Sequence, residues 1–368
     1  MTDDPLFADA RAVAGLLDAI RHVAEQLARP TTFMEVCGTH TQVVAAAGLR
    51  RLLPASIRLI SGPGCPVCVT PVGYLDRALA LAFLPDVTVC TFGDLMRVPS
   101  STMDLEAARA RGAHVAVVYS PRDAVRLARS RPDHRIVLLA VGFETTVPTI
   151  AAALAEAEDS ALNNFLVLPG NKIMPPPLRA LADDPDVRVD GFLLPGHVSV
   201  VTGWHAFRFL AADFGLSGVV VGFTPTDVLR GVLELALQVE RGRPQVVNLY
   251  SRAVTPAGNP TAWALVERFF EPADTGWRGF GQIPGSGLAL RPAWVHRDAS
   301  RIPVELPPPT EPQGCRCGDV LRGVVDPNQC ALFGAMCTPD APVGACMVSS
   351  EGSCAAWFRH EWREGSSE

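Results

Sequence analysis

The sequence has no long apolar segment, no long basic run and no recognisable export signal. No apolar stretch reaches the roughly 18 residues that a membrane helix needs, and the most apolar segments, such as 136–141, are as short as buried strands. No cluster of lysine and arginine marks a nucleic-acid surface, and the net charge is −6. The acidic start, MTDDPLFADA, lacks the charged and apolar regions of a signal peptide. These absences predict a cytoplasmic protein with neither a membrane nor a nucleic acid as partner.

Cysteine is missing from the centre of the chain and concentrated near its two ends. Four of the ten cysteines lie in the first hundred residues and six in the last fifty-four. Because the cytosol is reducing, clustered cysteines there are more often metal ligands or redox groups than structural disulfides. The distribution predicts two separate sulfur sites.

Strand-like and helical segments alternate over most of the chain. Such alternation is typical of parallel sheets whose faces are covered by helices, so the predicted fold class is α/β. Strands are expected at residues 32–36, 57–60, 87–91, 115–119, 136–141, 165–168, 191–194 and 219–221. Helices are expected at residues 9–28, 41–53, 72–84, 147–158, 200–214 and 226–240.

The alternation restarts after a basic turn around residues 129–135, which predicts two parallel-sheet α/β domains facing a cleft. Domain 1 is expected at 30–128, with the CGTH and CPVC motifs, and domain 2 at 129–252, with the GFETT and PGHVS loops. Residues 1–29 and 253–368 form a predicted third domain, smaller, partly helical and loop-rich, which carries six cysteines. Its small core indicates that a bound metal holds it together.

Most of the expected strands end in loops that are rich in glycine or polar residues. In open α/β sheets, ligands bind at the carboxyl ends of the strands, so we expect the chemistry at these loops. None of them is a Walker A motif or a complete G-x-G-x-x-G fingerprint, and nucleotide binding is not supported. The loops read CGTH, SGPGCPVC, TFGD, GFETT, PGNK, PGHVS and GFTPTD.

The N-terminal cysteines lie mainly in two of these loops. Cys37 opens CGTH, where His40 is placed either to ligate iron or to hydrogen-bond a thiolate and lower its pKa. Cys65 and Cys68 form a C-x-x-C pair after a Gly-Pro-Gly turn, at the expected start of a helix, which favours the thiolate. Such a pair binds metal or cycles between dithiol and disulfide. Taken alone, Cys37 is as typical of a small buried side chain as of a metal ligand. Cys90, inside VTVCTF, is expected in the core.

The six C-terminal cysteines are widely spaced. Zinc ribbons usually carry two C-x2-C pairs, which are absent here, whereas a 4Fe-4S cluster needs four thiolates and tolerates wide spacings. Two cysteines would then be surplus, either as a redox-active pair beside the cluster or as inert thiols. Structural zinc and six unrelated buried thiols are the alternatives. The residues are Cys315, Cys317, Cys330, Cys337, Cys346 and Cys354.

Three polar residues are further candidates for lining the cleft. Glu144 in GFETT and His197 in PGHVS occupy expected strand-end loops, where each is placed either for proton transfer or as a structural hydrogen-bond partner. Lys172 in PGNK is a candidate anion contact with the same structural alternative.

Seven motifs in order resemble the HypD family of hydrogenase maturation proteins. The resemblance extends from about residue 30 to residue 358, nearly the whole chain, and includes the arrangement of the cysteines. The motifs are CGTH, SGPGCPVC, GFETT, PGNK, PGHVSVVTG, CRCGDVLRG and GACMVSSEGSC.

The resemblance implies three α/β-containing domains and a role as the scaffold on which the Fe(CN)2CO group of [NiFe] hydrogenases is assembled. It implies a HypC-type chaperone and a HypE-type cyanide donor as partners. The iron-site cysteines of the family fall on Cys37, Cys65 and Cys68 of this chain.

The resemblance also assigns the C-terminal cysteines. The family's cluster pattern, C-x14-C-x6-C-x16-C, is matched at every interval by Cys315, Cys330, Cys337 and Cys354, which implies a 4Fe-4S cluster. The surplus residues are Cys317 and Cys346, and they resemble a redox-active thiol pair, similar in layout to ferredoxin:thioredoxin reductase.

Two other classes of function compete with the scaffold. A cluster-dependent disulfide reductase would turn over a disulfide substrate without a partner protein, so the sequence leaves open whether the chain is an enzyme. A plain electron carrier is disfavoured, because the large α/β body with its glycine-rich loops exceeds what a carrier needs.

Overall fold

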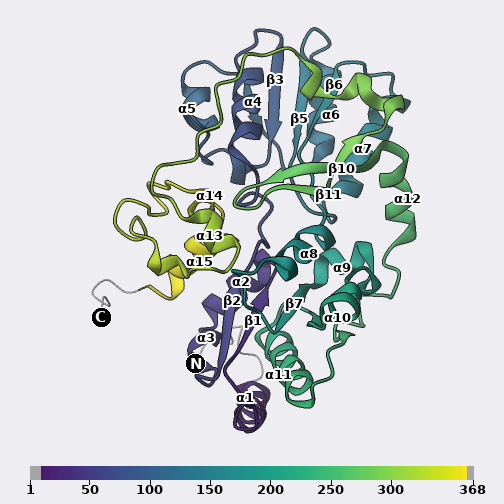
Figure 1. Cartoon of the computed structure of the whole chain (residues 1–368). Coiled ribbons are helices and arrows are strands. Elements are labelled where there is room, and N and C mark those ends of the chain that lie inside the picture. The colour runs from purple at the N-terminus through teal and green to yellow at the C-terminus, as the bar shows by residue number, and fades with distance from the viewer. Residues whose placement is uncertain (1–9, 363–368) are drawn as a thin grey trace.

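The computed structural model describes residues 10–362 and consists of two parallel sheets, a β-hairpin and a loop-rich C-terminal region (Figure 1). It confirms the predicted α/β class and the loop-rich region that carries the last six cysteines. Residues 1–9, on which the argument against a signal peptide depends, and residues 363–368 lie outside the described range. Within residues 10–362, no helix combines the length and the apolar character required to cross a membrane.

Sheet A has five parallel strands in the order β2-β1-β7-β8-β9. Its strands are β1 (Thr31–Glu35), β2 (Ile57–Ser61), β7 (Gly191–Pro195), β8 (Ser217–Val221) and β9 (Val246–Asn248). One face packs on α1, α2, α3 and α11, and the other on η3 and α10. These helices are α1 (Ala10–Ala24), α2 (Gly38–Ala46), α3 (Leu49–Leu52), η3 (Trp204–Phe207), α10 (Phe209–Phe214) and α11 (Pro225–Arg241).

Sheet B has four parallel strands in the order β4-β3-β5-β6. Its strands are β3 (Val87–Thr91), β4 (Val115–Val117), β5 (Arg135–Ala140) and β6 (Phe165–Pro169). Helices α6, α7 and α12 cover one face, and α4 and α5 the other. Their bounds are α4 (Val72–Ala82), α5 (Leu105–Ala110), α6 (Pro121–Ser130), α7 (Val147–Asp159) and α12 (Pro260–Phe269).

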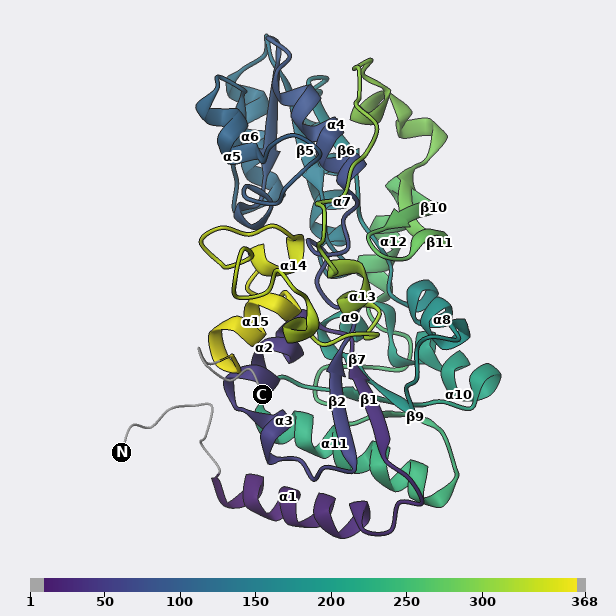
Figure 2. The ribbon, with the colours of Figure 1, turned by 60° about the vertical axis from the view of Figure 1, so that its left-hand side comes forward.

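The strands of the two sheets do not follow the predicted division at residue 128. Sheet A takes β1 and β2 from before this boundary and β7 to β9 from after it, whereas sheet B takes β3 to β6 from both sides. The chain leaves sheet A after β2 and returns at β7, which pairs with β1. Helix α1, which was predicted to join the C-terminal domain, packs instead on α11 (Figure 2). Local alternation of strands and helices does not reveal which strands pair, so the interleaving was missed.

Two expected helices are interrupted by glycines with left-handed backbone. Gly48 (φ +62°) separates α2 from α3, and Gly203 (φ +78°) separates α9 from η3 and α10. Glycine adopts this conformation without the steric cost of a Cβ atom. The remaining elements before the hairpin are η2 (Gly93–Leu95), α8 (Pro175–Asp183) and α9 (Gly196–Thr202).

An antiparallel hairpin that the sequence did not predict follows α12. It consists of β10 (Phe270–Trp277) and β11 (Gly281–Leu290), and its tip reaches toward the C-terminal cysteine region (Figure 1). That region lies between the two sheets, and its last helix packs on α2 (Figure 2). The short elements after the hairpin are η4 (Pro292–Arg297), η5 (Ala299–Arg301), α13 (Cys317–Leu321), η6 (Pro327–Gln329), α14 (Ala345–Val348) and α15 (Ser353–His360).

Arg50 attaches the end of the cysteine region to sheet A. Its side chain is 11% exposed and forms an ion pair with Glu361, just after α15. The same guanidinium donates to the Leu59 carbonyl at 3.0 Å and to Ser61 Oγ at 2.8 Å, both in β2. It also lies 5.5 Å from the centre of the Trp357 ring in α15. One side chain therefore connects β2 to the last helix.

Replacing Arg50 by methionine should loosen α15. The change leaves the buried Glu361 carboxylate without its counter-charge, which typically costs about 3–5 kcal/mol. We expect faster amide hydrogen exchange across residues 353–360. Arg51→Met is the matched control, because Arg51 is exposed and should leave the exchange unchanged. Equal exchange in both variants would show that Arg50 does not hold the helix.

Candidate metal and redox site

The N-terminal cysteines lie on two adjacent loops at the carboxyl ends of β1 and β2. Cys37 is the N-cap of α2, and the Gly38 amide donates to the Gly64 carbonyl at 2.9 Å. A Cβ atom on Gly64 would lie 2.3 Å from the Cys37 nitrogen, so only glycine permits this approach. The structure thus places the CGTH and CPVC loops side by side.

The Cys37 thiol is buried at the start of α2. Burial raises its pKa to about 12, although hydrogen bonds from the backbone amides of His40 and Thr39 act in the opposite direction. The thiol therefore keeps its proton at neutral pH, but the helix amides are in position to stabilise a thiolate once a cation approaches.

The C-x-x-C pair does not open a helix, contrary to the sequence prediction. Residues 66–69 form a turn, and α4 begins only at Val72, after its N-cap Pro71. Cys65 Sγ accepts a hydrogen bond from the Cys68 amide at 3.2 Å. Burial raises the pKa of Cys68 well above its usual value, so the expected activation of this thiol by a helix terminus is wrong.

Glu35 is a site residue that the sequence analysis missed. It is fully buried, and it accepts hydrogen bonds from the Cys37 amide at 3.2 Å and from Thr41 Oγ1 at 2.6 Å. Burial raises its pKa to about 7, although Arg50 lies 4.0 Å away. A lone carboxylate two residues before Cys37, at the end of the strand segment TTFME, was the signal that could have revealed it.

A second missed carboxylate reaches the same loop from the C-terminal region. Glu351 accepts a hydrogen bond from Thr39 Oγ1 at 3.2 Å. A Cβ atom on Gly38 would lie 2.5 Å from the Glu351 Cβ atom, so glycine at this position lets the two segments meet. Burial raises the pKa of Glu351, and its charge in turn raises the pKa of Cys37.

The two predicted histidines lie on an aromatic stack beside the Cys37 loop. The rings of His40 and His197 both stack on Phe223, with centroid distances of 5.1 Å and 3.7 Å. The His40 ring is buried, its Nε2 lies 2.9 Å from the Gly222 carbonyl, and burial lowers its pKa to about 4. The other ring nitrogen, Nδ1, has no hydrogen-bond partner among the described residues. The contact from His40 to Cys37 is made by its backbone amide.

The six C-terminal cysteines line one common cavity. Its other lining residues are largely apolar. A Cβ atom on Gly344 would lie 2.5 Å from Cys315 Sγ, and Cys337 Sγ accepts a hydrogen bond from the Val343 amide at 3.4 Å. Thiols from four separate segments that face one cavity, with backbone donors beside them, fit the ligand set of a 4Fe-4S cluster. The four on the predicted pattern are Cys315, Cys330, Cys337 and Cys354.

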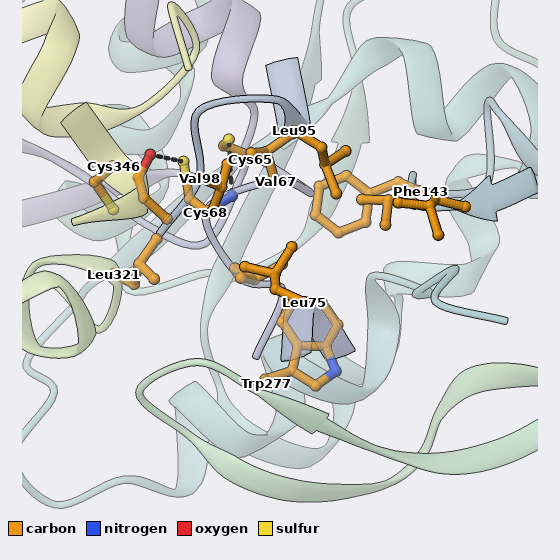
Figure 3. Close-up of a cluster of buried hydrophobic side chains, with 14 of the residues drawn as sticks. Cys65, Val67, Cys68, Leu75, Leu95, Val98, Phe143, Trp277, Leu321 and Cys346 are labelled. Carbon is orange, nitrogen blue, oxygen red and sulfur yellow. Dashed lines mark hydrogen bonds between the residues drawn. The ribbon is translucent and has the colours of Figure 1, made fainter. Parts of the chain in front are cut away.

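The two sulfur sites, predicted to be separate, are in contact. Cys317 Sγ lies 2.6 Å from Cys346 Sγ, and the Cys346 thiol in turn contacts that of Cys68. Figure 3 shows Cys65, Cys68 and Cys346 next to one another. Cys68 Sγ lies 3.8 Å from the Ala345 carbonyl oxygen. A continuous row of thiols therefore extends from the C-x-x-C loop to the predicted cluster cavity.

Single-ion coordination is not preformed in this arrangement. Within residues 10–362, no three Cys, His, Asp or Glu side chains converge on one point that could hold a metal ion. The buried Cys90 belongs to the core of β3, as predicted. An iron ion at Cys37 would therefore take part of its ligand set from elsewhere or require the two loops to adjust.

Glu144 and Lys172 have partners away from the cysteines. Glu144 is fully buried, its Oε1 accepts from the Met174 amide at 2.8 Å, and burial raises its pKa to about 7. Lys172 Nζ donates to the Gly276 carbonyl at 2.9 Å and lies 5.4 Å from the centre of the Trp277 ring. Burial lowers the pKa of Lys172 to about 8. These contacts give Lys172 a structural role in holding β10.

Glu35→Gln should make Cys37 react faster with an alkylating agent, but only at pH values above the carboxyl pKa of about 7. Above that pH the native carboxylate is charged and disfavours the Cys37 thiolate, whereas glutamine keeps the hydrogen-bond acceptor without the charge. We expect a several-fold higher rate, measured by mass mapping of the Cys37 peptide. The exposed Glu25→Gln is the control. Identical rates at every pH would contradict this electrostatic link.

Comparison with known proteins supports the family that the sequence motifs resemble. The HypD family model, described as "Hydrogenase formation hypA family", matches residues 11–361. The hydrogenase maturation factor HypD of Rhizobium leguminosarum bv. viciae is 47% identical over 347 residues, which cover 92% of this chain and 90% of the relative. HypD of Escherichia coli K12 is 43% identical over 364 residues, 96% of this chain and 97% of the relative. The chain therefore belongs to the HypD family of hydrogenase maturation factors.

Proposed function

We propose that this chain is the scaffold on which the Fe(CN)2CO moiety of [NiFe] hydrogenases is assembled. In this proposal a HypC-type chaperone shares the iron, a HypE-type protein delivers cyanide, and the work takes place in the cytoplasm. The observation that carries the proposal is the contact between Cys68 and Cys346, because it connects a thiol loop beside Cys37 to a cavity suited to a cluster.

Iron is the cargo in this proposal, and Cys37 is its anchor. Thiolate is a soft, strongly donating ligand, which suits low-spin iron that carries cyanide and carbonyl. The backbone amides of Thr39 and His40 already contact the Cys37 sulfur and would stabilise its thiolate. Because no three-ligand site is preformed among residues 10–362, a ligand from the chaperone completes the coordination, with Cys65 or Cys68 assisting.

The resident group in this proposal is a 4Fe-4S cluster held by Cys315, Cys330, Cys337 and Cys354, which supplies one-electron transfer when bound. Next to it, the Cys317 and Cys346 thiols are close enough to interconvert between dithiol and disulfide. The pKa of Cys346 is well above its usual value, since the lowering by Cys317 is outweighed by contacts with Cys354 and Cys68 and by burial. Thiol–disulfide exchange at Cys346 therefore requires a group that accepts the Cys346 proton, or a nearby positive charge that stabilises its thiolate.

Thiol exchange along the row keeps the iron site reduced. Cys346 attacks the Cys68 sulfur of a Cys65–Cys68 disulfide, and Cys65 leaves and takes a proton. Cys317 then attacks the Cys346 sulfur, a Cys317–Cys346 disulfide forms, and Cys68 leaves as a thiol. Two electrons and two protons have then moved to the C-x-x-C pair, and the contacts among these four thiols match the order of the steps.

A disulfide reductase of the ferredoxin:thioredoxin reductase type is the second candidate. The 2.6 Å separation of Cys317 Sγ and Cys346 Sγ, beside the cluster cavity, favours it. The reductase would reduce a disulfide substrate repeatedly without a partner protein, whereas the scaffold would co-purify with a small chaperone and with iron beyond its own cluster.

Cys37→Ala should abolish iron retention with the chaperone while the protein stays folded. Infrared spectroscopy of the anaerobically co-purified complex should show cyanide and carbonyl bands for the native protein and none for the variant. Cys90→Ala, which removes a buried thiol from the core of β3, is the matched control and should keep the bands. Native band intensity in Cys37→Ala would remove Cys37 from the ligand set.

Cys330→Ser should bleach the visible absorption of the anaerobically purified protein, because the cluster loses one of four thiolates. Cys317→Ser is the control, since Cys317 lines the same cavity but lies outside the predicted ligand pattern. It should retain the absorption. An unchanged spectrum of Cys330→Ser would refute the ligand assignment.

A further inference from the structure

A pocket of about 210 Å³ lies where the loops that follow β5 and β6 meet α9 and α12. Its wall includes Glu144 and Ile173 from these two loops, Thr202 from the end of α9 and Trp263 from α12. Among the described residues that line it, none is a cysteine and none belongs to the aromatic stack beside Cys37. A buried water molecule needs only about 10–15 Å³ of such space, so the pocket has room for a small organic molecule.

The wall of this pocket is largely apolar. Among its described lining residues, only Thr202 and Glu144 carry a side-chain oxygen, and Ile173, Val201 and Trp263 supply much of the remaining surface. The Thr202 hydroxyl donates to the carbonyl one helical turn earlier, at 3.1 Å, so its proton is already engaged within α9. A concave apolar surface with very few polar groups is the usual composition of a small-molecule site, in which the polar groups fix the orientation of the ligand.

Glu144 has one carboxyl oxygen that is hydrogen-bonded and one that is not. The side chain is fully buried, and its Oε1 accepts from the Met174 amide at 2.8 Å, which fixes the carboxyl group in the pocket wall. Its Oε2 has no hydrogen-bond partner among the described residues. A buried acceptor without a donor is costly, which indicates that a group entering the pocket supplies the donor. Burial also raises the pKa of Glu144 to about 7, so a positive charge beside it would stabilise the carboxylate.

We propose that this pocket binds a small organic cation with an apolar body, and that Glu144 Oε2 accepts a hydrogen bond from an N–H group of this cation. Such a ligand supplies both the missing donor and the counter-charge that a buried carboxylate needs. The half-buried Trp263 adds an aromatic ring, to which cations are attracted. Because Oε2 is shielded from solvent, the wall yields slightly when the donor enters. The inference is independent of the proposed scaffold function.

The test is a saturation-transfer NMR titration of the anaerobically purified full chain with benzamidine, a small aromatic cation, as the probe. Native protein should bind benzamidine about tenfold or more tightly than neutral benzamide or anionic benzoate, because only the cation forms a charge-assisted bond. Glu144→Gln should weaken benzamidine binding by a similar factor. Glu267→Gln is the matched control, because Glu267 is exposed on α12, and it should keep the native affinity. Absent binding, equal affinities for benzamidine and benzamide, or native affinity in Glu144→Gln would overturn the inference.

A second variant decides the matter if Glu144→Gln fails to fold. Ala206 in η3 lines the same pocket and is only half-buried, so Ala206→Leu fills the space while the carboxyl group of Glu144 stays in place. We expect this variant to lose benzamidine binding and to keep the circular dichroism spectrum of the native protein. Native affinity for benzamidine in a folded Ala206→Leu protein would show that the probe binds elsewhere and would refute the proposed site.

Discussion

The burial of cysteine thiols away from water is the physical constraint on which the rest of this structure depends. Burial raises the pKa of Cys37 to about 12 and that of Cys68 well above its usual value, so both thiols are protonated and poorly nucleophilic at neutral pH. A thiolate forms here only when a metal ion or another cation arrives to compensate for the lost hydration. The thiols are therefore unreactive without a bound cation, which suits the proposed role, in which a reactive iron species is handled only together with a chaperone.

The interleaved topology is what brings the buried sulfurs together. Because β1 and β2 belong to sheet A while the chain after the C-x-x-C loop enters sheet B, that loop lies at the crossing between the two sheets. The C-terminal cysteine region also lies at the crossing between the two sheets, and two buried arginines hold the segments together at this crossing. Arg50 connects it to β2, and Arg278 at the hairpin tip is bonded to the C-x-x-C loop. A division into two consecutive domains would have left the loop and the cavity without this shared position.

Local sequence patterns predicted eight strands and six helical segments, but they missed α5, α6, α8, α12 and β9 and did not reveal the tertiary relationships. The structure contains all eight expected strands, because a short run of apolar, β-branched residues such as 136–141 is a strong local signal for a buried strand. The hairpin was missed because Pro272, Gly281 and Gly285 interrupt its pattern, and the C-x-x-C helix was misplaced because the helix starts only after Pro71. The cysteines identified the sulfur sites, yet Glu35 escaped notice, because a lone carboxylate in a strand indicates a site residue only once that strand is known to be buried.

Charged side chains beside Cys37 were not revealed by sequence patterns. Burial raises the pKa of Cys37, and the negative charges of Glu35 and Glu351 raise it further. Negative charge beside Cys37 disfavours its thiolate, so the thiol is readily reprotonated when no cation compensates it. In the proposed role the Cys37 site must release its iron, and the two carboxylates beside it favour that release.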